Sequence, residues 1–184
     1  MRDLGLRLQR RLPCRYFVCA ILLCLAAALN AQTAKWEAYK YPADGFRATF
    51  PSEPKAEQNK KNASAGLILM NSYCSRVSET QLCVAVINEG PTPTGLTPEA
   101  MLSRVKVGVL IAPKAREIHE AEVMLDGHKG IEVETEDETT HLFTRIYLID
   151  KTVYQTVVTF PISTPFADAK RFLDSFKLIA RGGN

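Results

Sequence analysis

The sequence is poor in the residue types and motifs that mark common enzyme sites. Its 184 residues include three histidines and one tryptophan. They contain no HExxH, Gly-x-Ser-x-Gly or Gly-rich phosphate-binding motif, which excludes the usual zinc-peptidase, serine-hydrolase and P-loop signatures. An enzyme on this chain would have to assemble its site from dispersed residues. We therefore expect a protein that binds rather than one that catalyses.

The chain also lacks an apolar run of membrane-spanning length. Tyr16–Leu29 is 14 residues long, whereas a spanning helix needs roughly 20. Arginines precede this run and alanines follow it, which is typical of a secretory signal peptide. We interpret residues 1–31 as a cleavable signal and residues 32–184 as one domain of a secreted or periplasmic protein with no stable membrane span. A retained N-terminal anchor is the alternative, and cleavage after Ala28 or after Ala31 stays open.

The basic surplus of the full chain belongs to this N-terminal segment. The chain carries 23 Lys and Arg against 20 Asp and Glu, a net charge of +3. The first 31 residues hold five Arg and one Asp, which leaves 18 basic and 19 acidic residues and a net charge of −1. The remaining domain has no electrostatic footprint for nucleic acid.

Only two cysteines, Cys74 and Cys83, lie outside the proposed signal. They flank a polar stretch, and a hairpin turn near Ser78 and Glu79 would place them directly opposite each other. Opposed residues in a non-hydrogen-bonded antiparallel pair come within disulfide reach. We predict a Cys74–Cys83 disulfide. Two reduced, buried cysteines are the alternative, and no CxxC motif indicates a redox-active pair.

Most of the remaining chain has the alternation or the β-branched and aromatic content of strands. The expected strands are Lys35–Tyr41, Phe46–Phe50, Leu67–Cys74, Leu82–Asn88, Arg116–Leu125, Lys129–Asp137, His141–Ile149 and Thr152–Phe160. Ser52–Ala63 is polar and reads as a loop or a weak edge strand.

Two segments have helix start signals, a threonine N-cap followed by proline at the first helical position. One is Thr97-Pro98, with the helix ending before Pro113, and the other is Thr164-Pro165. Short connections make the strands mostly antiparallel. The pattern predicts an α+β fold, with a mostly antiparallel sheet of about six to eight strands and two main helices packed on it.

Two groups of core and turn residues carry a resemblance to a known family. They are Trp36, Tyr39, Pro42, Gly45, Phe46, Phe50 and Pro51 near the start, and the segments 145–149, 153–155 and 171–176. The chain resembles PsbP-like domains, especially uncharacterised secreted bacterial proteins of that group, over nearly all of residues 32–184. The resemblance implies an α/β/α sandwich and a non-catalytic binding or assembly role. Residues for a photosystem contact are not among those shared.

Arg145 is the most informative polar residue, because it interrupts an otherwise apolar strand on the same face as Tyr147. A charge in that place must be paired or must face a cleft. One reading is an anion-holding residue in a pocket. The other, which we favour, is a buried ion pair with Glu132, Glu134 or Asp174.

The histidines and acidic residues give no metal-site spacing. His119, His128 and His141 could bind zinc with Glu120 or Glu132, but no HxH or HExxH pair occurs. We expect scattered surface histidines, no metal site and no cofactor.

The acidic run over residues 132–138 could bind calcium, but no Asp-x-Asp-x-Asp-Gly loop is present. We read it as the solvated face of a half-buried strand.

These observations favour a secreted, non-enzymatic domain that binds an unidentified protein or small ligand. The alternative is a metal-dependent or hydrolytic enzyme built from dispersed His and Asp or Glu. An assembly factor with an exposed edge strand is a third reading.

Overall fold

The structure is a computed structural model that describes residues 35–63, 66–88, 97, 100, 102, 103, 106 and 115–182. The proposed signal and most of the first predicted helix lie outside the described residues. Within the described residues, no helix has the length and apolar character of a membrane-crossing segment.

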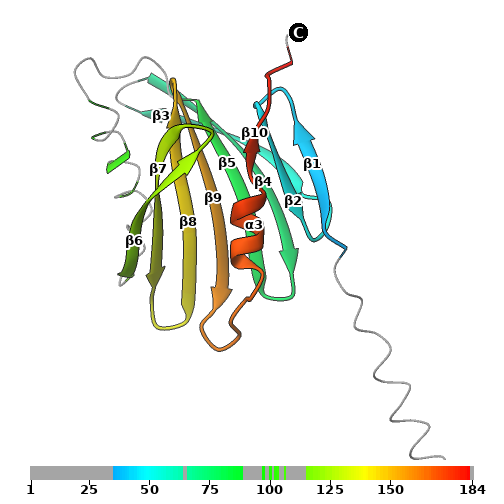
Figure 1. The fold of residues 1–184 in the computed structure, drawn as a ribbon, viewed down its shortest axis with the longest axis vertical. Coiled ribbons are helices and arrows are strands. Elements are labelled where there is room, and N and C mark those ends of the chain that lie inside the picture. Colours follow the sequence, from blue (N-terminus) through cyan, green and yellow to red (C-terminus); the bar gives the residue numbers. More distant parts are fainter. Residues whose placement is uncertain are drawn as a thin grey trace, which may run out of the picture. The chain divides into compact units, whose positions relative to one another are not determined.

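The described part of the chain contains ten strands and one bounded helix (Figure 1). In chain order they are β1 (Glu37–Tyr41), β2 (Phe46–Phe50), β3 (Lys55–Ala63), β4 (Gly66–Val77), β5 (Thr80–Asn88), β6 (Arg116–Leu125), β7 (His128–Glu136), β8 (Thr140–Ile149), β9 (Thr152–Pro161), α3 (Ala169–Ser175) and β10 (Lys177–Leu178). All pairings between these strands are antiparallel, which confirms the predicted direction of strand pairing.

The strands form two sheets rather than the single sheet of six to eight strands that the sequence predicts. The larger has the order β3-β4-β5-β9-β8-β7-β6, and the smaller has the order β1-β2-β10. β3, expected to be a loop or weak edge strand, pairs with β4 along its whole length. Its lysines and amides give this strand no hydrophobic alternation, so the pattern of apolar residues does not predict it. Such polar residues are common on edge strands, where they discourage pairing with other chains.

Three two-residue turns, including the one predicted near Ser78 and Glu79, set the register of the large sheet. Ser78, Asp126 and Asp150 each adopt a positive φ, of 51°, 49° and 54°. Tight hairpin turns need this conformation, and aspartate tolerates it better than most side chains.

The small sheet packs on the large one instead of extending it, because β2 buries its apolar side. Phe46 and Phe50 are fully buried. Their rings lie 5.7 Å from Phe176 and 5.2 Å from Phe172, and α3 itself contacts β2, β8 and β9. The main hydrophobic core therefore lies between one face of the large sheet, α3 and β2.

The second predicted helix is shorter than the sequence indicates, and Thr164 is not its N-cap. α3 begins after Asp168. The backbone N–H of Thr164 instead donates to the carbonyl of Pro161 at 3.0 Å. This turn leaves Phe166 packed against Phe160, with ring centroids 6.5 Å apart. Burial of that ring outweighs the local preference for an earlier helix start.

The expectation of two main helices is also not borne out. α3 is the one helix with defined bounds in the described part of the chain. Residues 100, 102, 103 and 106 are helical, and Thr97 Oγ1 accepts a hydrogen bond from the Ala100 N–H at 3.2 Å, as an N-cap does. The rest of the predicted helix lies outside the described residues.

Candidate ligand-binding site

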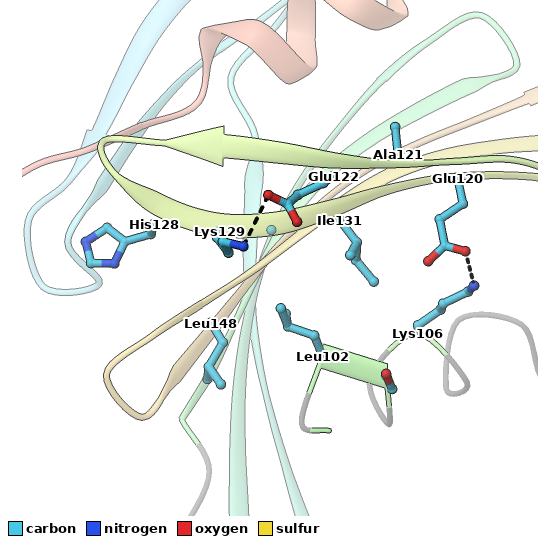
Figure 2. A pocket seen from close by; sticks show the side chains of 11 residues that line it. Leu102, Lys106, Glu120, Ala121, Glu122, His128, Lys129, Ile131 and Leu148 are labelled. Atoms are coloured by element: carbon cyan, nitrogen blue, oxygen red, sulfur yellow. Dashed lines mark hydrogen bonds and ion pairs between the residues drawn. The ribbon is translucent and has the colours of Figure 1, made fainter. Parts of the chain in front are cut away.

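A cavity of about 570 Å³ opens on the face of the large sheet that is opposite the main core. It lies between the strands β6, β7 and β8 and the helical residues Leu102, Ser103 and Lys106 (Figure 2). This volume falls within the range of small-molecule sites. The residues that line it are Leu102, Ser103, Lys106, Glu120, Ala121, Glu122, His128, Lys129, Gly130, Ile131 and Leu148.

The apolar part of the cavity comes from three side chains on different elements. Ile131 on β7 and Leu148 on β8 project from the sheet, and Leu102 faces them (Figure 2). Leu102 is buried and belongs to a second, smaller apolar cluster with Ile146 and Val153. Successive strand residues point to opposite faces, so this cluster is separated from the main core by the sheet itself.

The charged residues beside the cavity form ion pairs with one another. Lys106 Nζ lies 2.7 Å from Glu120 Oε2 and 2.8 Å from Glu117 Oε2. Hydrogen bonds from Lys106 to these two carboxylates raise its pKa, which keeps it charged. Lys129 Nζ lies 3.5 Å from Glu122 Oε1. A ligand therefore meets paired charges rather than a lone ammonium or carboxylate.

No nucleophile and base are assembled among the described residues of the cavity. Ser103 supplies a hydroxyl and His128 an imidazole, but among the described residues no hydrogen bond joins them. Nucleophilic catalysis requires that these groups be within hydrogen-bond reach. His128 begins β7 beside the Asp126-Gly127 turn, well away from Lys106 and Glu120 in Figure 2.

Arg145, the residue predicted to be in a pocket or an ion pair, does not line this cavity. It lies on the opposite face of β8, where its Nε donates to Glu132 Oε2 at 2.6 Å and its Nη1 donates to Asp174 Oδ1 at 2.7 Å. Burial lowers the pKa of Arg145, but the hydrogen bonds to the two carboxylates outweigh it and leave the pKa raised. The guanidinium thus joins α3 to the sheet.

Tyr147, the second predicted site residue, is a core residue. Its ring is buried and stacks on Phe176, with centroids 6.2 Å apart and planes 6° apart. It also covers Gly130, where a Cβ atom would meet the Tyr147 ring at 2.3 Å. Burial raises the pKa of Tyr147. Glycine at position 130 leaves the space that this ring fills.

The acidic side of β7 is not the solvated face that the sequence indicates. The Glu132 side chain is 8% exposed, because the face turns toward α3 and Arg145. Each of the three glutamates has a basic partner: Glu132 with Arg145, Glu134 with His141, and Glu136 with Arg116. The alternation of residues in β7 predicts that these glutamates share a face. It does not show that the neighbouring strands β6 and β8 supply their basic partners.

The cysteines are apart from the cavity, on β4 and β5. Cys74 and Cys83 are directly opposed in the register, and their sulfur atoms are bonded at 2.11 Å. The turn at Ser78-Glu79 produces this register, as the sequence predicts.

The residues around the cavity could not be identified from the sequence. Ile131 and Leu148 occupy ordinary apolar positions of strands, and Leu102 occupies an ordinary apolar position of a predicted helix. Periodicity predicts that such residues are buried, but it does not show whether the space around them is filled by other side chains or left as a cavity.

Comparisons with known proteins identify the fold. No protein-family model matches the chain, and no curated protein matches it. The solution structure of cyanobacterial PsbP (CyanoP) from Synechocystis sp. PCC 6803 is similar, with a TM-score of 0.54 and 14% sequence identity. The match covers 81% of this chain and 95% of that one. Likeness at this identity concerns fold and not activity. The chain has a PsbP-like fold, as its core and turn residues indicated.

Proposed function

We propose that this chain is a secreted or periplasmic, non-enzymatic binding domain that holds a small, partly apolar ligand between β6–β8 and the residues Leu102, Ser103 and Lys106. The observation that carries the proposal is the cavity of about 570 Å³, where the apolar side chains of Leu102, Ile131 and Leu148 lie among charged groups. Its neighbouring charged side chains already form ion pairs with one another. Such a site gains free energy by removing apolar ligand surface from water.

Export is supported by two features of the chain. The basic and then apolar N-terminal segment has the layout of a signal peptide. The two remaining cysteines are paired, and disulfides persist in oxidising compartments. The N-terminal sequence of the mature protein, read by mass spectrometry, tests this part of the proposal.

Binding can be tested with the fluorescent probe anilinonaphthalene sulfonate, which has an apolar ring system and one anionic sulfonate group. We expect saturable binding at one site, and Leu148→Trp should weaken it at least about tenfold, equivalent to about 1.4 kcal/mol. The larger ring fills the cavity beside Ile131. Ile162→Trp adds the same ring at an exposed turn and serves as the control, where binding should be unchanged.

Circular dichroism of both variants checks that they are folded. If Leu148→Trp does not fold, Ile131→Phe is a second variant that fills the cavity. Equal probe binding by the wild type and a folded filling variant would rule out the cavity as the binding site.

A further inference from the structure

His119, Glu132 and Glu134 meet on the face of the large sheet opposite the cavity. Each offers one ligand atom, and these atoms all lie within 4.8 Å of one another. We infer that the three side chains form a binding site for a divalent transition-metal ion such as Zn²⁺. The inference is independent of the proposed ligand cavity, since no residue is shared between the two sites.

A β-bulge brings His119 into this group. Glu117 pairs with Thr135, but His119 pairs with Glu134, so Ile118 is an extra residue in β6. If the regular pairing from Glu117 continued, Ile118 would lie opposite Glu134 and the imidazole would point to the other face. Bulges re-aim side chains in this way and are common beside functional sites.

The spacing of the ligand atoms suits an ion between them. His119 Nε2 lies 4.0 Å from Glu132 Oε1, which is too far for a hydrogen bond. Two ligands at the usual zinc distances of about 2.0–2.1 Å would be roughly 3.4 Å apart in a tetrahedral site. The His119 side chain is 50% exposed, so a small rotation can close this difference.

Both carboxylates are oriented by groups behind them. Arg145 Nε donates to Glu132 Oε2, which leaves Oε1 directed toward His119. His141 Nε2 lies 3.3 Å from Glu134 Oε2. Outer polar contacts of this kind hold metal ligands in place, so Arg145 and His141 act as positioning residues.

The charge balance of this face leaves room for a divalent cation. Among the described residues, Glu132, Glu134, Glu136 and Asp174 are the carboxylates in its ion pairs, and Arg145 and Arg116 are the guanidinium groups. With neutral imidazoles, the negative charges exceed the positive charges by two. An imidazole ligand selects a transition metal over calcium or magnesium, and the exposed side of His119 leaves a coordination position for water.

Calorimetric titration with Zn²⁺ tests the inference. The full chain is used with Cys14→Ser, Cys19→Ser and Cys24→Ser, so that its only remaining cysteines are the disulfide pair. We expect one Zn²⁺ per chain, no comparable binding of Ca²⁺, and at least about a tenfold loss of affinity in His119→Ala.

His128→Ala is the matched control, because this exposed histidine lies outside the group. Its affinity for Zn²⁺ should equal that of the unchanged chain. Co²⁺ gives a second readout, since its visible absorption spectrum reports nitrogen and oxygen ligands and should change in His119→Ala but not in His128→Ala.

The inference is overturned if His119→Ala binds Zn²⁺ as tightly as the unchanged chain, or if His128→Ala loses as much affinity. Binding only at millimolar Zn²⁺ would likewise mean adventitious surface binding. His119 is half exposed, so its replacement should leave the fold intact, and an unchanged thermal transition without metal verifies this.

Discussion

Two threonines on neighbouring strands are buried to the same degree but differ in hydrogen bonding. Thr144 and Thr156 are both 0% exposed. Thr144 Oγ1 donates to the Thr156 carbonyl at 2.9 Å. Thr156 Oγ1 has no hydrogen-bond partner in the described part of the chain. A buried hydroxyl without a partner costs free energy, whereas a paired one contributes modestly.

We predict opposite effects for the same substitution at these two positions. Thr156→Val should raise the free energy of unfolding by about 1 kcal/mol, because it removes an unpaired polar atom and keeps the side-chain shape. Thr144→Val should lower it by about 1 kcal/mol, because it removes a hydrogen bond. Urea unfolding of both variants measures the difference. A loss of stability in Thr156→Val would mean that its hydroxyl is paired.

At the scale of elements, α3 depends on the sheet for its existence. It has seven residues, and isolated helices of that length are unstable in water. Phe172 and Leu173 are buried against the core, and Asp174 is held by Arg145 at its exposed side. The helix forms where its apolar side and its carboxylate both find partners.

The β4–β5 hairpin is closed by the Cys74–Cys83 disulfide across directly opposed residues. Replacing both cysteines by serine should lower the free energy of unfolding by roughly 2–3 kcal/mol, because the unfolded chain regains the entropy of the short loop. Urea unfolding with and without reductant measures this. The double variant should be insensitive to reductant, and a wild type that is equally insensitive would contradict the prediction.

At the scale of the whole domain, one buried carboxylate joins the two sheets. Asp44, in the turn between β1 and β2, accepts hydrogen bonds from Tyr73 Oη and from Asn71 Nδ2, the latter at 3.0 and 3.1 Å. Its carbonyl accepts one from Tyr154 Oη at 2.9 Å. The turn of the small sheet is thereby held to β4 and β9 of the large one.

This network predicts a loss of stability at alkaline pH. Burial, followed by the hydrogen bond and charge of Asp44, raises the pKa of Tyr73. The unfolded chain releases the tyrosine proton near pH 10, about its ordinary pKa, while the folded chain retains it. The stabilisation is therefore complete below about pH 10 and declines as the pH rises above that value.

Tyr73→Phe removes this titration, so its stability should fall less steeply than that of the wild type above about pH 10. Near neutral pH the variant should be less stable, since Asp44 loses a donor. Urea unfolding across the alkaline range compares the two slopes. The other tyrosines are common to both proteins, so equal slopes would show that Tyr73 does not titrate differently on folding.

The strands with clear alternation, the tight turns and the pairing of Cys74 with Cys83 could all be predicted from the sequence. These features depend on neighbouring residues and on short connections, so local physical rules are enough to predict them. The sequence also indicated that Arg145 needs a partner, because an unpaired charge is unfavourable in an apolar strand. The PsbP-like fold followed from core and turn residues of the same local kind.

Which surfaces meet became clear only from the packed structure. Burial of Phe46 and Phe50 placed β1 and β2 in a separate sheet, and packing of Phe166 delayed the start of α3. The bulge at Ile118 set His119 opposite Glu134, and the cavity formed where Leu102, Ile131 and Leu148 leave space between them. Such contacts join residues far apart in the chain, so their geometry depends on the whole packed arrangement and no local pattern encodes it.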